Sequence, residues 1–253
     1  MKGIIGAAIS LLLMASCITG EGASSSAEAS ATHPIASPMP NPTATATPCQ
    51  NPEGGPTNTC LGDIAAGTYH TQTFQPGLRY SVPEGWGNLE DLPGNFLLLP
   101  PGATLAGVNP GTSDYIGAYT SVVAPGRCTG QPSEDVPLTF DGLVGWITSN
   151  PRVNVTGVHD VSVGGLDGVV MDVSLRAAKG DGCPDGVYAD VYVGTGPSSL
   201  VHGVIKDYRL RVYLLREHSR TLAIEVADAP GGSKYKRWFD AAGTVVHSFR
   251  FTT

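Results

Sequence analysis

The segment from Gly20 to Pro48 limits what this chain can fold into more than any other feature. It consists mainly of Ala, Ser, Thr and Pro, and such a composition cannot bury enough apolar surface to offset the entropy lost on ordering. Its prolines favour extended conformations, which is typical of a semi-flexible spacer. We therefore expect residues 17–60 to be a linker and residues 61–253 to be a single globular domain. A domain of that size buries a substantial core without metals or cofactors.

A short apolar stretch from Ile4 to Met14 follows the positively charged start Met1-Lys2. Its length suits the core of a signal peptide, whereas a membrane-spanning helix needs about 20 apolar residues. Small residues then precede Cys17 in the run Leu13-Met14-Ala15-Ser16-Cys17. This run resembles the bacterial lipobox, which implies that residues 1–16 are a lipoprotein signal peptide and that the Cys17 thiol receives diacylglycerol. The alternative is an ordinary secretory signal followed by an incidental cysteine.

Lipidation would make the membrane the first partner of this chain. Two or three acyl chains, such as palmitate, are enough for stable anchoring. The expected location is the cell membrane, with the domain lipid-anchored on the extracytoplasmic face and held away from the bilayer by the linker.

Four further cysteines, Cys49, Cys60, Cys128 and Cys183, lie beyond the proposed lipidation site. An even number in an exported chain predicts two disulfides, although four cysteines allow three connectivities. We favour Cys49–Cys60, which closes a small loop at the end of the linker, and Cys128–Cys183, which joins two loops rich in Gly and Pro. The rival is a metal site, but no Cys-x-x-Cys or clustered Cys/His spacing supports it.

The net charge of −7 argues against nucleic-acid binding, which requires a basic surface. Residues 1–199 carry 6 basic and 17 acidic residues, and residues 200–253 carry 9 and 5. Opposite charges on adjacent strands of one sheet explain such a division. A basic face for an anionic lipid or wall polymer is the alternative.

The domain reads as strands interrupted by two helices. Alternating or β-rich runs predict strands at 68–74, 78–82, 96–99, 115–123, 153–158, 166–175, 187–193, 208–215 and 222–226. Phe140, Leu143, Val144 and Ile147 follow helical spacing, with Thr139 or Asp141 as the N-cap and Asn150-Pro151 as the stop. A second apolar stripe runs from Trp238 to Phe249. In the strand at 208–215, alternation predicts one solvated face, which is typical of an antiparallel sheet. The fold class is therefore α+β.

Two motifs carry a family resemblance. The run from Phe74 to Trp86, which contains Val82-Pro83-Glu84-Gly85-Trp86, resembles the opening hairpin of Mog1/PsbP-like domains. The closing Ser248-Phe249-Arg250-Phe251 is similar to the end of the same superfamily, and the chain also resembles surface lipoproteins of actinobacteria. The resemblance covers roughly residues 67–251. It implies an α/β/α sandwich around an antiparallel sheet and a docking or ligand-holding role without catalytic residues.

No sequence motif of a hydrolase, a metalloprotease or a nucleotide-binding site is present. The pair His159-Asp160 suggests catalysis, but neighbours on a strand point to opposite faces. His202 and His218 read as solvated surface, and Glu90-Asp91 as an isolated pair on a loop. Asp181 to Gly186 has too few carboxylates for a calcium site and reads as a turn.

The glycines of Val163-Gly164-Gly165-Leu166 lie between two strand-like runs and predict a hairpin turn. Trp86 and Trp238 are expected in the core. Trp146 lies off the stripe of its helix and is the candidate contact for a partner.

These observations favour a non-catalytic binding or interaction module at the cell envelope, with an envelope protein or a lipid as its possible ligand. A structural or assembly role without a small ligand is the first alternative. A hydrolase whose catalytic residues come from distant segments is the second.

Overall fold

The structure is a computed structural model that describes residues 61–103, 113–126, 129–176, 188–198, 200–229 and 235–252. All of them belong to the compact unit Thr43–Thr253.

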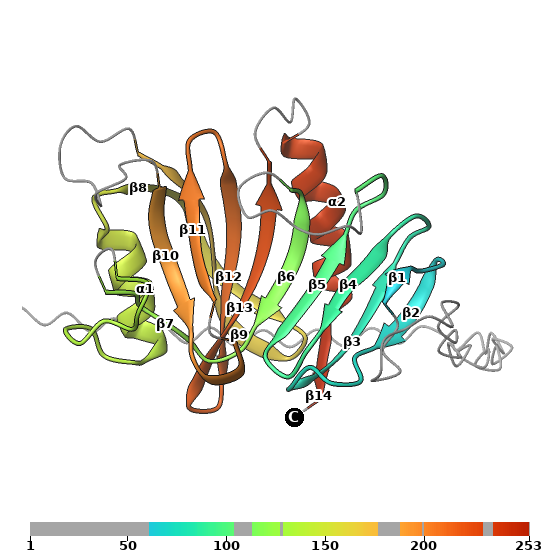
Figure 1. The fold of residues 1–253 in the computed structure, drawn as a ribbon, viewed down its shortest axis with the longest axis horizontal. Helices are drawn as coiled ribbons and strands as arrows, with labels where there is room; N and C mark the ends of the chain where they lie inside the picture. The colour runs from blue at the N-terminus through green and yellow to red at the C-terminus, as the bar shows by residue number, and fades with distance from the viewer. Residues whose placement is uncertain are drawn as a thin grey trace, which may run out of the picture. The chain divides into compact units, whose positions relative to one another are not determined.

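An eight-stranded antiparallel sheet forms the centre of the domain (Figure 1). Its strands, in spatial order, are β1 (Gly62–Asp63), β4 (Gly87–Asp91), β5 (Asn95–Leu99), β6 (Tyr115–Tyr119), β13 (Arg220–Asp228), β12 (Arg209–Glu217), β9 (Leu166–Leu175) and β8 (Val153–Val163).

Two smaller antiparallel sheets and two α-helices complete the described part of the chain. One small sheet contains β11 (Val201–Ile205), β10 (Tyr188–Gly194) and β7 (Val122–Val123), and the other contains β14 (Arg250–Thr252), β3 (Gly77–Val82) and β2 (Gly67–His70). The helices are α1 (Phe140–Ser149) and α2 (Tyr235–His247), with a 3-10 turn at Gly196–Ser198. Neither α-helix has the length and apolarity needed to cross a bilayer. These elements confirm the expected α+β class.

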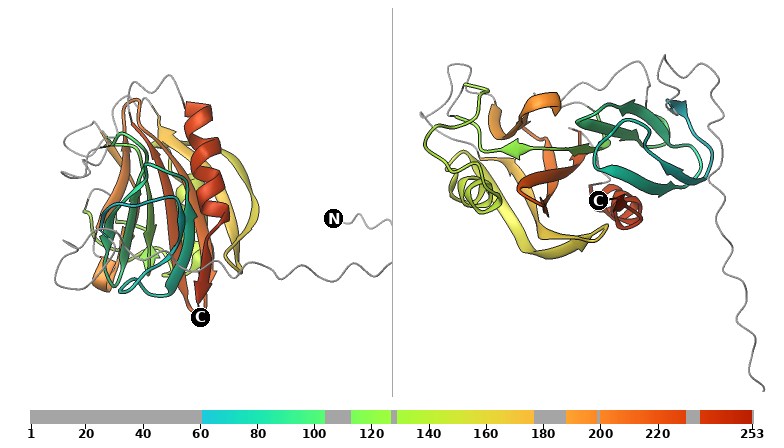
Figure 2. Two further views of the ribbon diagram at one scale, coloured as in Figure 1. Left: turned by 90° about the vertical axis from the view of Figure 1, so that its right-hand side faces the viewer. Right: turned by 90° about the horizontal axis from the view of Figure 1, so that it is seen from below.

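Strand β13 contributes to two separate hydrophobic cores. Leu222, Ile224 and Val226 belong to the first core, and Ala223 and Ala227 belong to the second. Because successive side chains of a strand point to opposite faces, the two cores lie on opposite faces of the main sheet. Helix α2 packs in the first core and α1 in the second, and Figure 2 shows the two helices separated by the sheet.

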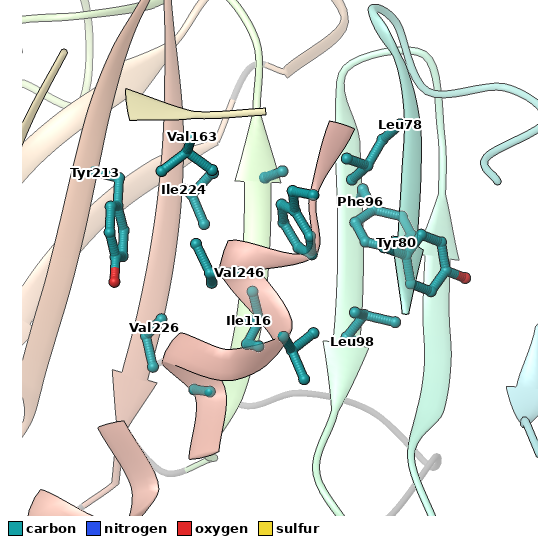
Figure 3. Packing of buried hydrophobic residues seen from close by; sticks show 14 of the residues in the cluster. Leu78, Tyr80, Phe96, Leu98, Ile116, Val163, Tyr213, Ile224, Val226 and Val246 are labelled. Atoms are coloured by element: carbon teal, nitrogen blue, oxygen red, sulfur yellow. The ribbon is translucent and has the colours of Figure 1, made fainter. Parts of the chain in front are cut away.

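In the first core, α2 lies between the main sheet and β3. Figure 3 shows Val246 of α2 beside Ile224 and Ile116 of the main sheet, with Leu78 and Tyr80 of β3 further along.

The two tryptophans expected in the core are both buried in it. Trp86 and Trp238 stack with ring centroids 5.9 Å apart. The Trp238 Nε1–H donates to the Ala227 carbonyl at 2.7 Å, which satisfies its polar group.

Helix α1 forms where its apolar spacing predicts it. The Thr139 hydroxyl accepts a hydrogen bond from the Gly142 amide at 3.1 Å, so Thr139 is the N-cap. Phe140, Leu143 and Ile147 are buried against the second core.

The β8–β9 hairpin turns at Gly164-Gly165, as the sequence predicts, and both glycines have positive φ (63° and 91°). The turn also meets the C-terminal strand, because the Phe251 amide donates to the Gly164 carbonyl at 3.2 Å.

Two strand predictions need correction. The predicted strand 115–123 is divided at Ser121, whose φ of 57° breaks the extended chain. Residues before the break join the main sheet as β6, and residues after it join the small sheet as β7.

The face of β12 predicted to be solvated is covered by α2. Tyr213 on that face is buried, and the Arg211 guanidinium lies 4.5 Å from the ring centre of Phe239 while pairing with Asp172 on β9 at 2.7 Å. Arg211 covers apolar surface with its long side chain while its charge is paired with Asp172. A covered face of this kind gives the same alternation of polar and apolar residues in the sequence as a face exposed to solvent.

Candidate functional site

An open groove lies between the start of α1 and the β8–β9 hairpin. Its volume is about 470 Å³. Three elements of the main sheet and the first residue of α1 form its walls. The lining residues are Phe140, Asp160, Val161, Ser162, Asp167, Gly168, Val169 and Arg216. We call this feature the groove.

Strand register places the polar side chains of the groove. Ser162 is paired with Asp167, and Asp160 is paired with Val169. Directly paired residues project from the same face of a sheet. Val169 packs against the second core, so these residues lie on the α1 face of the hairpin.

Arg216 forms the opposite wall and is held in place by α1. Its Nη2 donates to Asp141 Oδ1 at 2.7 Å, and its guanidinium carbon lies 3.8 Å from the ring centre of Phe140. The arginine therefore has an ion pair and a cation–π contact that restrict its rotamers. Asp141 lies in the first turn of α1, where a negative charge is favourable.

The two carboxylates of the groove have no such partners. Within the described part of the chain, neither Asp160 nor Asp167 makes a side-chain hydrogen bond or an ion pair, and both are exposed. Among the described residues, the groove thus presents two carboxylates without an ion-pair partner opposite a guanidinium that contacts α1.

A second feature, the Glu225 cluster, is buried between the main sheet and the β11–β10–β7 sheet. It consists of Glu225, His202 and four tyrosines, Tyr115, Tyr119, Tyr192 and Tyr208. Tyr115 and Tyr192 donate hydrogen bonds to Glu225, the latter at 2.6 Å. His202 Nδ1 lies 3.3 Å from the same carboxylate.

Local irregularities bring these side chains together. A bulge in β10 between Asp190 and Tyr192 sets Tyr192 opposite His202, and the two rings stack with centroids 4.5 Å apart. The Tyr119 ring lies 4.0 Å from His202 on centroids. It covers Gly117, where an added Cβ would be 2.5 Å from the Tyr119 ring. Gly117 is thus required for the tyrosine to reach this position.

The pKa values of the cluster indicate an ionised Glu225 carboxylate and protonated tyrosine donors. Burial alone would raise the pKa of Glu225, but the charge of His202 and the hydrogen bonds from His202, Tyr115 and Tyr192 hold it below its usual value. Burial and the charge of Glu225 raise the pKa of Tyr115 and Tyr192 well above the usual value. Both tyrosines therefore remain protonated and donate to Glu225.

Glu90 lies at the margin of the cluster. Burial raises its pKa, and the charge of His202 opposes that rise. Glu90 Oε2 and His202 Nε2 are both buried without a hydrogen-bond partner in the described chain. Because 7% or less of His202 and of Glu225 is exposed, the cluster acts as an internal polar link between two sheets.

Two predictions about titratable residues were wrong. His202, expected on the solvated surface, is buried at the centre of the cluster, where the bulge in β10 sets it opposite Tyr192. Glu90 and Asp91 lie in β4 rather than in a loop. Asp91 accepts hydrogen bonds from the amides of Gln72, Thr73 and Phe74, so it stabilises the loop before β3.

His218 and His159 agree with their predictions. His218 is exposed in the β12–β13 turn, where it contacts Glu217 at 3.2 Å. His159 is exposed on β8, and its Nδ1 contacts the Gly157 carbonyl at 2.7 Å rather than Asp160. His159 is exposed on β8 whereas His202 is buried in the Glu225 cluster, so the two histidines do not form one site.

Of the remaining candidate residues, Trp146 lies in the described part of the chain and the others do not. Trp146 is partly buried and packs against the second core, and its proposed partner contact stays a prediction. Cys17, Cys49, Cys60, Cys128, Cys183 and the turn at Asp181–Gly186 lie outside the described residues. Among the residues that are described, no three His, Cys, Asp or Glu side chains are placed to hold a metal ion.

One feature of the sequence points to the Glu225 cluster. Glu225 interrupts the otherwise apolar run Leu222–Ala227. A charged residue inside a buried strand must be paired and hydrogen-bonded, so this position predicts partners even though it does not identify them.

No protein-family model matches this chain, and a search of curated proteins finds no match either. Three solved structures are similar at 12% identity. A protein from Bacteroides thetaiotaomicron has a TM-score of 0.33, and the match covers 70% of this chain and 45% of that protein. The cyanobacterial PsbP, CyanoP, from Synechocystis has a TM-score of 0.33, with coverages of 78% and 100%. LpqN of Mycobacterium tuberculosis, described as involved in cell envelope biogenesis, has a TM-score of 0.35, with coverages of 79% and 88%. Such low values leave the functional argument to the groove and the Glu225 cluster.

Proposed function

We propose that this chain is a lipid-anchored, extracytoplasmic lipoprotein whose domain is a non-catalytic binding module of the cell envelope. The apolar leader, Cys17 and the linker support the anchor. The groove carries the binding role, because it is a concave, mixed polar and apolar site with few fixed charged groups.

The supporting elements of the groove favour recognition by a preformed surface. Its floor is a paired hairpin and its wall includes a helix start, so its polar groups stand on regular secondary structure rather than on long loops. Sites on such elements hold their geometry more tightly than sites on loops. Arg216 is further restricted by Asp141 and Phe140. Preorganisation of this kind lowers the entropy lost on binding.

The proposed architecture is a Mog1/PsbP-like sandwich. Three features support it. Helices α1 and α2 lie on opposite faces of an antiparallel sheet, and the Val82–Trp86 motif joins β3 to β4. The closing Ser248–Phe251 motif likewise joins α2 to β14.

Intact-mass analysis of the native protein tests the anchor. We expect a chain that begins at Cys17 and carries two or three acyl chains, and we expect Cys17→Ala to be released from membranes. A native Cys17 with a free thiol, or a retained leader, would contradict the anchor and leave the binding role to be tested alone.

Native mass spectrometry of the full-length protein tests the groove. After incubation with a small-molecule extract of the envelope, the wild type should carry a saturable added mass. Ser162→Tyr, which fills the groove, should lose it. Thr156→Tyr on the same strand is the matched control, since Thr156 is exposed, pairs with Asp172 and does not line the groove. Equal loads on all three proteins, or none on the wild type, would refute the binding role.

A further inference from the structure

The charges of the groove are divided between its two sides. Asp160, Ser162 and Asp167 come from the β8–β9 hairpin, and Arg216 comes from β12 beside α1. A ligand that fills the groove therefore meets acceptors on one side and a guanidinium on the other. From this division we infer that the groove binds a small zwitterion, with its ammonium group toward Asp160 and Asp167 and its anionic group toward Arg216. The inference rests on the binding role proposed above and specifies its ligand chemistry.

The hairpin side suits an ammonium group. An ammonium carries three hydrogen-bond donors and no acceptor. Two carboxylates without other partners and the Ser162 hydroxyl supply acceptors within one short stretch of sheet. Asp160 and Asp167 are diagonal neighbours on one face of the β8–β9 pair, so one ammonium can donate charge-assisted hydrogen bonds to the carboxylates of both strands.

The opposite side suits an anionic group. Arg216 has five N–H donors, and the described structure accounts for one of its nitrogens, Nη2, in the hydrogen bond to Asp141. The Phe140 ring covers one face of the guanidinium, which leaves its edge as the surface from which the other nitrogens donate. Planar guanidinium edges bind carboxylate and phosphate oxygens in pairs.

Neither half of such a ligand fits the whole groove. A simple cation would leave the remaining Arg216 donors unpaired, and a simple anion would be repelled by Asp160 and Asp167. A zwitterion satisfies both sides and adds no net charge. Val169, which projects from the α1 face, supplies apolar contact for the short linker between the two groups. The volume of about 470 Å³ admits a molecule of roughly dipeptide size.

This chemistry has two sources at a cell envelope: a phosphoethanolamine headgroup and the termini of a short peptide. Isothermal titration calorimetry of the full-length protein in detergent distinguishes them with two probes, glycerophosphoethanolamine, whose phosphodiester carries a single negative charge, and the dipeptide alanyl-alanine. Ethanolamine, the cation alone, and acetate, the anion alone, are the matched comparisons. At least one zwitterion should saturate the protein and bind at least about 10-fold more tightly than ethanolamine and acetate. The tighter of the two zwitterions identifies the source.

Variants test the two sides separately. Asp160→Asn combined with Asp167→Asn should weaken binding of the zwitterion about 10-fold or more, and the exposed control Asp207→Asn should leave it unchanged. Arg216→Lys keeps a positive charge but loses the planar edge. It should weaken the zwitterion severalfold and leave ethanolamine unaffected. Circular dichroism confirms that each variant is folded.

Failure of both zwitterions to saturate the protein, or equal affinity for ethanolamine, would overturn the inference. The binding role would survive that result if Ser162→Tyr still removed a different envelope ligand in the native mass spectra, so the two failures can be told apart.

Discussion

Glu225 is a carboxylate in the middle of the central strand, and its environment is built from two sheets. Three donors, Tyr115, Tyr192 and His202, converge on it. Removing one member of a buried, hydrogen-bonded charge pair costs about 3–5 kcal/mol, because the remaining groups stay buried without partners. Glu225→Ala should therefore lower the free energy of unfolding by about that amount, measured by urea denaturation. Glu134→Ala in an exposed loop should change it by less than about 0.5 kcal/mol.

Acid should weaken the interaction of Glu225 with its three donors. The pKa of Glu225 is held below its ordinary value of 4.5 in the folded protein. Its contribution to stability is thus present above that pH and is lost as the pH falls through the folded pKa. Glu225→Gln cannot titrate. The difference in unfolding free energy between wild type and Glu225→Gln should shrink on acidification below 4.5, and a difference independent of pH would contradict the assigned charge state.

Asp228 should have the opposite pH dependence. Burial, and then the charge of Asp114, raise its pKa from 3.8 to about 6, while Arg209 opposes the rise. The folded protein therefore binds this proton more tightly than the unfolded chain, and Asp228 makes unfolding easier as the pH rises from 3.8 to about 6. Asp228→Asn should remove this slope from urea unfolding curves recorded on either side of the window. A slope unchanged by Asp228→Asn would show that another group titrates there.

At the level of single residues, the sequence predicted burial well where it followed an apolar stripe and poorly where partners came from distant strands. Trp86 and Trp238 were placed correctly. His202 was not, because its burial depends on an extra residue in β10 that pairing alone reveals.

Strand β12 leaves no room for a side chain at Gly168 of β9. A Cβ added there would be 1.9 Å from the Leu214 carbonyl oxygen, so Gly168→Ala requires a backbone shift. We expect a loss of about 1–3 kcal/mol in the free energy of unfolding, typical of overpacking. Gly145 lies on the exposed face of α1, and a Cβ added there meets nothing within 4 Å. Gly145→Ala should instead stabilise the protein by about 0.5–1 kcal/mol. Equal effects of the two substitutions in thermal denaturation would contradict the close approach.

Elements with local determinants were predictable, and those defined by tertiary contacts were not. Helix α1 has its own cap and stripe, and the β8–β9 turn has two glycines. The switch at Ser121 from one sheet to another has no local signal. Strand β11 (Val201–Ile205) was missed because His202 and Gly203 dilute its β character, and it forms by pairing with β10. For the same reason the groove could not be predicted: it requires the register of three strands and the position of α1.

The whole domain should unfold in a single transition, because both cores share the main sheet and β13 contributes side chains to each. Its tryptophans test this directly. Trp86 and Trp238 report on the first core, and Trp146 reports on the second. Fluorescence midpoints of Trp146→Phe and of the Trp86→Phe, Trp238→Phe double variant should each coincide with the circular dichroism midpoint of the same protein. A fluorescence midpoint that departs from it would indicate that one core melts independently.

The hydrogen bond from Phe251 to Gly164 has a practical consequence for assays. This bond joins β14 to the β8–β9 turn, which Ser162 and Asp167 of the groove flank. A purification handle or surface tether fused after Thr253 would begin three residues beyond Phe251, and pulling on it would place force on this hydrogen bond. Capture through the acyl chains proposed for Cys17 would place no force on this hydrogen bond, so affinities measured in a supported bilayer should describe the undisturbed groove.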